Sequence, residues 1–138
     1  MKALSMKQPV PELILQGKKT IELRTWKSNF RGEFYLHASK NVIPRLMDVF
    51  KFKIEDLSQG AIVGKATIKD MKIYTEEKQF QKDADKHLVP GKMYKNPTYG
   101  YILEEPVRLE KPIPYKGQLS FFDVNLTPTK QLKLGEFK

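Results

Sequence analysis

Four side chains that could form a ligand-binding site lie close together in the chain: Lys19, Glu22, Arg24 and Trp26. Residues 20–26 alternate between polar and apolar types, which is the pattern of a half-buried strand. This alternation places Glu22, Arg24 and Trp26 on one face, whereas Lys19 lies at the start of the strand, where its direction is not fixed. Arginine offers a rigid fork of donors, glutamate accepts hydrogen bonds, and tryptophan offers a flat face for stacking. Groups of these three kinds recognise a nucleobase or a nucleotide.

The same strand also has a purely structural interpretation. Ile21 and Leu23 point away from the polar face and can enter a hydrophobic core. On the polar face, Glu22 and Arg24 could form a salt bridge beside an aromatic ring without binding any ligand. The sequence of the strand alone leaves both interpretations open.

The chain is basic, with a formal charge of +9 from 25 Lys and Arg against 16 Asp and Glu. Residues 1–31 carry seven basic and two acidic side chains and so contribute +5, whereas the other 107 residues contribute only +4. Such clustering beside a candidate pocket favours an anionic partner such as a nucleic-acid backbone. The alternative explanation of the positive charge is that the lysine-rich composition reflects the genome and not the function. The residues expected to contact phosphates are Lys7, Lys18, Lys27, Arg31 and Lys40.

The composition excludes several kinds of site. The 138 residues contain no cysteine, which rules out disulfides, thiolate catalysis and a cysteine-ligated zinc site. The two histidines, His37 and His87, lie far apart without a matching cluster, so we expect neither a metal nor a cofactor. There is no run of eighteen apolar residues, and the first six residues lack the hydrophobic region of a signal peptide. We therefore expect a cytoplasmic protein that does not enter a membrane.

The patterning predicts one domain of class α+β over residues 1–138, with residues 127–138 as a C-terminal tail. Several short strands, two or three helices and a final strand that closes the sheet suggest a small mixed β-barrel. The expected strands span residues 2–6, 20–26, 33–38, 61–74, 99–104, 107–109 and 119–126.

Two helices and one charged segment connect these strands. Apolar residues at helical spacing after Pro9 predict a first helix, which Gly17 ends. A second helix is expected from about residue 39 to residue 51, with Asn41 as its N-cap. Its apolar stripe, expected in the core, consists of Val42, Leu46, Val49 and Phe50. The charged residues 75–88 could form a helix, and we interpret them as a solvated face or as an excursion over the barrel.

The segment around Glu22 resembles a known family signature. Gly17, Lys19, Glu22 and Arg24 match the G-x-K-x-x-E-x-R signature of the ASCH domain, a branch of the PUA-like superfamily. Other segments resemble the family in the same order over nearly the whole chain: Ser5-x-x-Gln8-Pro9, His37-Ala38-Ser39-Lys40, and residues 60–64, 99–103 and 117–122. The resemblance implies a PUA-like β-barrel with flanking helices and a cleft whose floor is the signature.

We favour an RNA- or modified-nucleotide-binding domain as the function that the resemblance implies. A basic rim would position the nucleic-acid backbone, and an aromatic-flanked cleft would accept a base. The expected ligand-binding residues are Gln8, Lys19, Glu22, Arg24, Trp26 and Tyr99.

A small hydrolase is the alternative. Some ASCH proteins resemble this chain and act as amidohydrolases on N4-acetylcytidine, with a Thr nucleophile at the position of Glu22 and a lysine at the position of Lys19. The threonine is absent from that position here, so Lys19 and Glu22 are catalytic candidates only if the domain is an enzyme. Other ASCH-like proteins have been assigned ribonuclease activity, for which Lys19, His37 and Tyr99 are the candidates.

Overall fold

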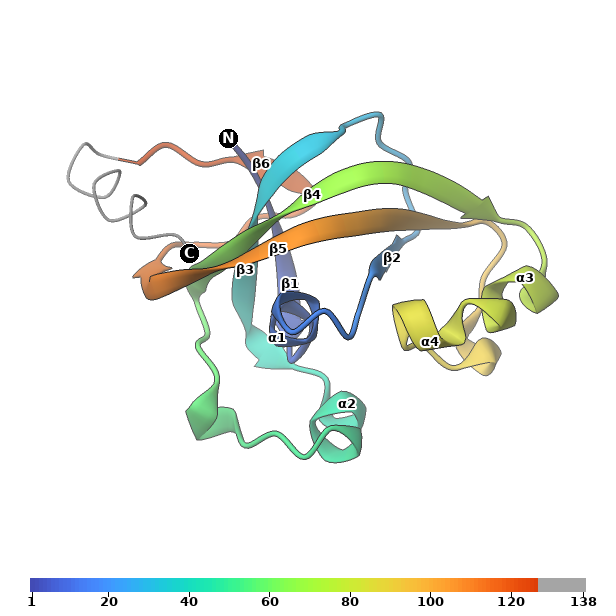
Figure 1. Ribbon diagram of the computed structural model, residues 1–138, viewed down its shortest axis with the longest axis horizontal. Coiled ribbons are helices and arrows are strands. Elements are labelled where there is room, and N and C mark those ends of the chain that lie inside the picture. Colours follow the sequence, from blue (N-terminus) through green and yellow to red (C-terminus); the bar gives the residue numbers. More distant parts are fainter. Residues whose placement is uncertain (127–138) are drawn as a thin grey trace.

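The computed structural model describes residues 1–126 as a mixed α+β fold built on one six-stranded sheet (Figure 1). Residues 127–138, where we expect a C-terminal tail, lie outside the described part of the chain. The strands are β1 (Lys2–Gln8), β2 (Ile21–Arg24), β3 (Gly32–Val42), β4 (Ala61–Tyr74), β5 (Thr98–Pro114) and β6 (Phe121–Asp123). The α-helices are α1 (Val10–Leu15), α2 (Pro44–Val49), α3 (Glu77–Lys82) and α4 (Ala84–His87), and two single 3-10 turns span Ile54–Asp56 and Gly91–Met93.

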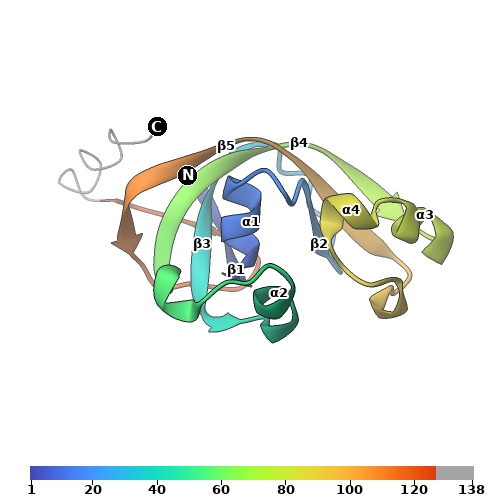
Figure 2. The ribbon, with the colours of Figure 1, turned by 60° about the horizontal axis from the view of Figure 1, so that its bottom comes forward.

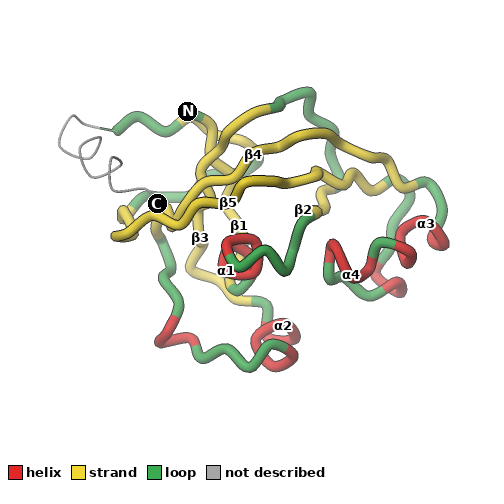
Figure 3. Tube along the Cα trace, in the orientation of Figure 1, coloured by secondary structure: helices red, strands yellow, loops and turns green. Residues whose placement is uncertain are grey.

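The sheet has the strand order β2-β5-β4-β3-β1-β6. β1 pairs in parallel with β3 and antiparallel with β6, and the long strands β4 and β5 pair antiparallel along most of their length. Figure 2 shows that these long strands bend into an arch over α1, and Figure 3 shows the helices on one side of the sheet. The sheet is not closed into a barrel, so the α+β class is confirmed and the expected barrel is not.

Both faces of the middle of the sheet are buried. Along β3, Phe34 and Leu36 face a core that also contains Leu13 and Ile14 of α1. Tyr35 lies on the opposite face of β3, in a smaller apolar cluster closed by Phe122 of β6. The alternation expected for β3 is therefore correct, but each of its faces packs against apolar side chains.

The end of α1 sets up the signature segment. Gly17 adopts a left-handed conformation with φ of +77°, which glycine tolerates without steric cost. The Gly17 amide donates to the Ile14 carbonyl, and the Lys18 amide donates to the Leu13 carbonyl, at 3.0 and 2.9 Å. These two hydrogen bonds form a Schellman motif, which reverses the chain directly before Lys19.

The second helix is shorter than expected, and its predicted N-cap is wrong. β3 continues to Val42, so Asn41 lies in the strand, and α2 begins only at Pro44. Proline suits the first turn of a helix and holds the residue before it in an extended conformation, as Ile43 shows with φ −104° and ψ 100°. We expected both Val49 and Leu46 in the core. Leu46 is buried there, but Val49 is 59% exposed and lies outside it.

Residues 75–88 are packed more tightly than a solvated face would be. They form α3 and α4, and Phe80, Asp83 and His87 among them are buried. The Asp83 carboxylate accepts hydrogen bonds from Tyr74 and Lys72 of β4, both at 2.6 Å. These hydrogen bonds connect the segment that forms α3 and α4 to the end of β4.

The C-terminal strands also differ from the expected pattern. β5 continues through residues 104–106, where a break was expected, with Glu105 at a positive φ of 51°. A register shift between Lys65 and Thr67 of the partner strand β4 accommodates this irregularity. The last strand is limited to Phe121–Asp123, which pairs with β1.

Candidate functional site

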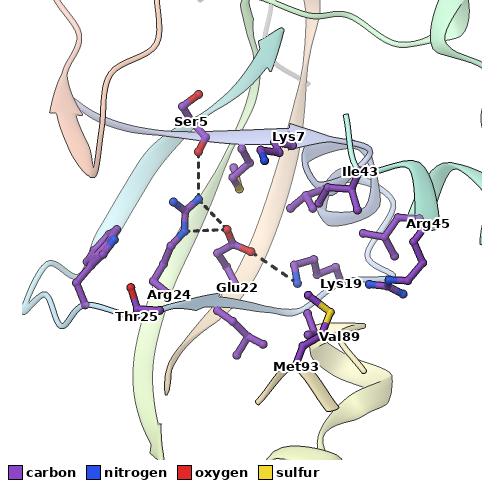
Figure 4. Close-up of a pocket in the computed structure, with 15 residues that line it drawn as sticks. Ser5, Lys7, Lys19, Glu22, Arg24, Thr25, Ile43, Arg45, Val89 and Met93 are labelled. Atoms are coloured by element: carbon purple, nitrogen blue, oxygen red, sulfur yellow. Dashed lines mark hydrogen bonds and ion pairs between the residues drawn. The ribbon is translucent and has the colours of Figure 1, made fainter. Parts of the chain in front are cut away.

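The signature segment lines a cavity of about 480 Å³, which we call the signature cavity (Figure 4). β1 and the start of α1 form one wall, β2 another, the start of α2 a third, and the loop after α4 closes the fourth side. The lining residues are Ser5, Met6, Lys7, Val10, Lys19, Glu22, Leu23, Arg24, Thr25, Trp26, Ile43, Arg45, Leu46, Val89 and Met93.

Glu22 lies at the centre of a polar network in this cavity (Figure 4). Its Oε2 atom accepts hydrogen bonds from Nε and Nη2 of Arg24, at 3.0 and 2.8 Å. Its Oε1 atom lies 3.6 Å from Nζ of Lys19, and Arg24 Nη2 also donates to the carbonyl oxygen of Ser5, at 3.1 Å. One carboxylate therefore orients two cations, and Arg24 links β2 to β1.

Lys19 is the most deeply buried charged side chain of the cavity, with 3% of its side chain exposed. Its ammonium group donates to the carbonyl oxygen of His87 at the end of α4. Burial lowers the pKa of Lys19, because the charged form loses its hydration, and the nearby Glu22 carboxylate partly opposes this effect. The last residue of α4 thus supplies the hydrogen-bond acceptor for Lys19, which lies 68 positions earlier in the chain.

The two faces of β2 are less distinct than the alternation predicts. Ile21 is buried, as expected, but Leu23 is only half-buried and lines the signature cavity instead of the core. Trp26 lies just beyond the end of β2, where its ring packs against Tyr101 and Phe121 at centroid distances of 5.7 and 5.4 Å. The strand ends at Arg24, so strict alternation no longer determines the side chains that follow it.

Gln8 and Tyr99 do not line the signature cavity. The Gln8 side chain donates to the carbonyl oxygen of Ser58 at 2.8 Å and lines a different, smaller cavity beside Glu12. Tyr99 lies opposite Arg24 in the β2–β5 ladder. His37 borders another cavity, on the far side of β1, so the residues expected for ribonuclease activity are not brought together.

The basic residues expected to contact phosphates are also dispersed. Lys7 lines the signature cavity, and Lys40 lines the cavity that contains His37. The Lys18 ammonium lies 5.8 Å from the centre of the Phe50 ring. The remaining two, Lys27 and Arg31, are exposed outside the lining of the signature cavity.

Arg45 is a charged residue of the cavity lining that the sequence patterns do not single out. It is exposed at the second position of α2, and its guanidinium donates to the carbonyl oxygen of Leu88 at 3.1 Å. An arginine directly after a proline that starts a helix is a detectable signal. However, its contribution to the cavity depends on the tertiary placement of α2 and of the loop after α4.

The family comparison agrees with this architecture. The model of the ASCH domain matches residues 4–125. The chain belongs to the ASCH domain family.

Solved ASCH structures share the fold of this ASCH domain at low sequence identity. The crystal structure of ASCH from Zymomonas mobilis has a TM-score of 0.65 and 13% identity, covering 97% of this chain and 92% of the other. Two mutant structures of the same Zymomonas mobilis protein each have a TM-score of 0.68 and 12% identity, and cover 99% of this chain and 96% or 98% of theirs. The comparison with curated proteins finds no match.

The signature cavity of this ASCH domain has an excess of positive charge. Four cationic side chains line it, from Lys7, Lys19, Arg24 and Arg45, against the single carboxylate of Glu22. Within residues 1–126, no three His, Asp or Glu side chains are grouped so that they could hold a metal ion. No helix in the same part of the chain is long and apolar enough to cross a membrane. The electrostatics of the cavity therefore favour an anionic ligand.

Proposed function

We propose that the signature cavity binds RNA by holding one nucleotide unit of the strand. The observation that carries this proposal is the charge of the cavity, whose four cationic side chains exceed its single carboxylate by three. That carboxylate, Glu22, is already paired with Lys19 and Arg24. The volume of about 480 Å³ is in the usual range for a small-molecule or nucleotide site. ASCH domains are generally thought to bind RNA, which agrees with this assignment.

Lys7 and Arg45 are the residues best suited to hold the phosphate. Both are exposed at the rim, and neither forms an ion pair with a carboxylate among the described residues. Arg24 and Trp26 form the opposite wall, where the guanidinium lies 5.8 Å from the centre of the indole ring. A base that enters between these walls would contact a cation and an aromatic edge together.

Glu22 acts in this proposal by orienting Lys19 and Arg24. Both of its carboxylate oxygens face these cations, so it has little remaining capacity to accept a hydrogen bond from a base edge. The same contacts leave neither carboxylate oxygen free of a cation, so Glu22 is poorly placed to hold an attacking water. The binding function therefore fits this geometry better than water activation by Glu22.

Lys19 is the one observation that favours the alternative, a nucleoside amidohydrolase. Its lowered pKa is a property of lysines that act as bases or nucleophiles. However, its ammonium is held by Glu22 and the His87 carbonyl, and Glu22 replaces the threonine that serves as nucleophile in the amidohydrolases that resemble this chain. We therefore keep hydrolysis as the second candidate.

RNA binding is tested by fluorescence anisotropy with a labelled single-stranded RNA of about ten nucleotides over a series of salt concentrations. We expect Lys7→Ala and Arg45→Ala to weaken binding and to reduce the slope of log affinity against log salt by about 0.7 for each lost phosphate contact. Lys69→Ala is the matched control, because Lys69 is exposed on β4 outside the cavity. An unchanged slope in both cavity variants, or no binding at low salt, would refute the proposal.

The hydrolase alternative is tested by chromatographic conversion of N4-acetylcytidine to cytidine. We expect no conversion by the wild-type protein, and Lys19→Ala provides the blank. Glu22→Thr restores the residue found in the amidohydrolases and is expected to gain a trace of activity at most. Efficient turnover by the wild type that Lys19→Ala abolishes would establish the hydrolase instead.

A further inference from the structure

A second cavity, of about 690 Å³, lies on the other side of β1 from the signature cavity. Its lining includes Ser5, His37, Lys40, Lys116 and Leu119. Ser5 borders both cavities and contributes a different group to each: its carbonyl oxygen accepts from Arg24, and its hydroxyl contacts His37. In Figure 4 the Ser5 side chain points away from the Glu22 network while its carbonyl points toward Arg24.

The hydrogen bonds of His37 fix its tautomer. Nε2 lies 2.6 Å from the carbonyl oxygen of Tyr115, which can only accept, so Nε2 carries the hydrogen. In the neutral ring Nδ1 is then the acceptor, and the Ser5 hydroxyl, 2.9 Å away, donates to it. This is the arrangement of a serine nucleophile, a histidine base and a third group that orients the base.

The surroundings keep His37 ready to accept a proton. His37 is 1% exposed, and burial lowers the pKa of its imidazole, so the ring is neutral near pH 7. Ser5 is only partly buried, and both Ser5 and His37 line the second cavity. A neutral imidazole bonded to a serine hydroxyl is the resting state that nucleophilic catalysis requires.

We propose that Ser5 and His37 form a second site, a serine-histidine pair that hydrolyses carboxylic esters bearing a negative charge. Lys40 and Lys116 provide the positive charge, and none of the residues described as lining this cavity is acidic. Tyr115 and Leu119 provide apolar surface for the rest of the substrate. The site adjoins the signature cavity at Ser5, but it uses the Ser5 hydroxyl and His37, so the proposed reaction does not depend on RNA binding.

The reaction proceeds in two balanced steps. Ser5 Oγ attacks the ester carbonyl carbon while its proton moves to Nδ1 of His37, and the C–O bond to the alcohol breaks as Nδ1 returns the proton to the leaving oxygen. Water then attacks the acyl-Ser5 ester, giving its proton to Nδ1, and the carboxylic acid is released as Ser5 recovers a proton. No oxidant or metal is needed.

Covalent trapping tests the nucleophile directly. The full-length protein is treated with a fluorophosphonate, which phosphonylates activated serines with loss of fluoride, and the modified residue is located by peptide mass spectrometry. We expect modification at Ser5 that Ser5→Ala removes and that the control Ser58→Ala retains, since Ser58 lies outside this cavity. His37→Gln is expected to slow labelling by about a hundredfold or more.

Gly117 offers an independent variant that keeps both functional groups. A methyl group at this position would lie 2.9 Å from Ser5 Oγ and 2.8 Å from Cε1 of His37, so Gly117→Ala should displace the pair and slow labelling. Circular dichroism and thermal melts establish that each variant is folded. A folded wild-type protein that is not labelled at Ser5, or labelling unchanged in His37→Gln, would overturn the proposal.

The substrate class is tested with two esters. The wild type should hydrolyse mono-4-nitrophenyl succinate, which carries a carboxylate, with a KM several-fold lower than that for neutral 4-nitrophenyl acetate. The double variant Lys40→Ala, Lys116→Ala should remove this difference, whereas Lys69→Ala should retain it. Equal KM values for the two esters in the wild type would refute the anionic substrate class.

Discussion

The two cavities meet at Ser5, and they stabilise their buried polar groups by different means. In the signature cavity, charges are paired with charges: the Glu22 carboxylate lies between the Lys19 ammonium and the Arg24 guanidinium. In the second cavity, a neutral imidazole is held by a hydroxyl and a carbonyl. A charge left without its partner in a protein interior costs far more than an unpaired dipole. The same fold therefore contains one site that is sensitive to loss of charge and one that is sensitive to protonation.

The largest expected effect comes from removing the charge of Glu22. Glu22→Gln keeps the shape of the side chain but leaves buried Lys19 without its carboxylate, which should lower the free energy of unfolding by about 3–5 kcal/mol. Urea denaturation monitored by the fluorescence of Trp26 measures this change. Glu33→Gln is the matched control, because the Glu33–Lys65 pair lies on the surface with 54% and 28% of the side chains exposed, and it should cost less than about 1 kcal/mol. Equal losses in the two variants would contradict the contrast between the cavities.

The next effect is the pH dependence of stability, to which both histidines contribute. Burial lowers the pKa of His37 and of His87, so the unfolded chain binds more protons than the folded one below about pH 6.5. The free energy of unfolding should therefore fall as the pH is lowered from 7 to 5, by at most about 1.4 kcal/mol per pH unit for each histidine. His37→Gln should reduce this slope, as measured by urea denaturation at several pH values. A slope that is unchanged in the variant would show that His37 does not contribute.

The two rings should also differ from each other. Nδ1 of His87 accepts from the backbone amide of Val89 at 3.0 Å, and this N–H cannot turn to become an acceptor. Nδ1 of His37 accepts from the Ser5 hydroxyl, which can rotate and accept instead. We therefore expect His87 to titrate at a lower pH than His37 when the imidazole signals are followed by NMR. The reverse order would show that hydroxyl rotation does not ease the protonation of His37.

A smaller effect is expected from Arg24→Lys, which preserves the charge but removes the guanidinium fork. A lysine cannot donate to Glu22 through two nitrogens while also reaching the Ser5 carbonyl. RNA affinity should fall about tenfold, corresponding to about 1.4 kcal/mol. Anisotropy at constant salt provides the measurement, and affinity equal to the wild type would show that the fork is not needed for binding.

The smallest effects belong to the exposed lysines outside the signature cavity. Lys18→Ala and Lys27→Ala should each reduce the salt slope of RNA binding by no more than about 0.7, and the losses should be similar for all RNA sequences. Both effects should be smaller than that of Lys7→Ala, because Lys7 lines the cavity. A larger effect from Lys27 than from Lys7 would place the RNA on another surface.

Local patterns in the sequence predicted those parts of the fold that local physics determines. The strand expected over residues 61–74 is β4 with the same bounds, and Gly17 ends α1 with the left-handed geometry that favours glycine. The signature residues Lys19, Glu22 and Arg24 line one cavity, although the alternation alone does not fix the direction of Lys19. The family assignment is confirmed by the match over residues 4–125.

Features that depend on tertiary contacts could not be predicted in this way. Gln8 is close to the signature in sequence, but the turn after β1 directs its amide toward Ser58 instead. Arg45 lines the cavity beside the loop after α4, where its guanidinium donates to the Leu88 carbonyl, and this contact joins residues 43 positions apart in the chain. The acceptor for Lys19 is a backbone carbonyl, that of His87, and every residue type provides such a group, so no sequence pattern could mark it. The proposed pair of Ser5 and His37 likewise arises from the parallel register of β1 and β3.

The position of β1 has a further consequence, for the order in which the chain folds. β1 precedes the other five strands of the sheet in the chain, yet one of its two neighbours is β6, and the Val124 amide donates to the Met1 carbonyl, 123 positions away in sequence. Contacts of such high sequence separation carry a large loop-closure entropy and slow folding. A nascent chain that has not yet exposed residues 121–123 beyond the ribosome leaves one edge of β1 unpaired, so we expect the wall that carries Ser5 to become ordered only after these residues have emerged.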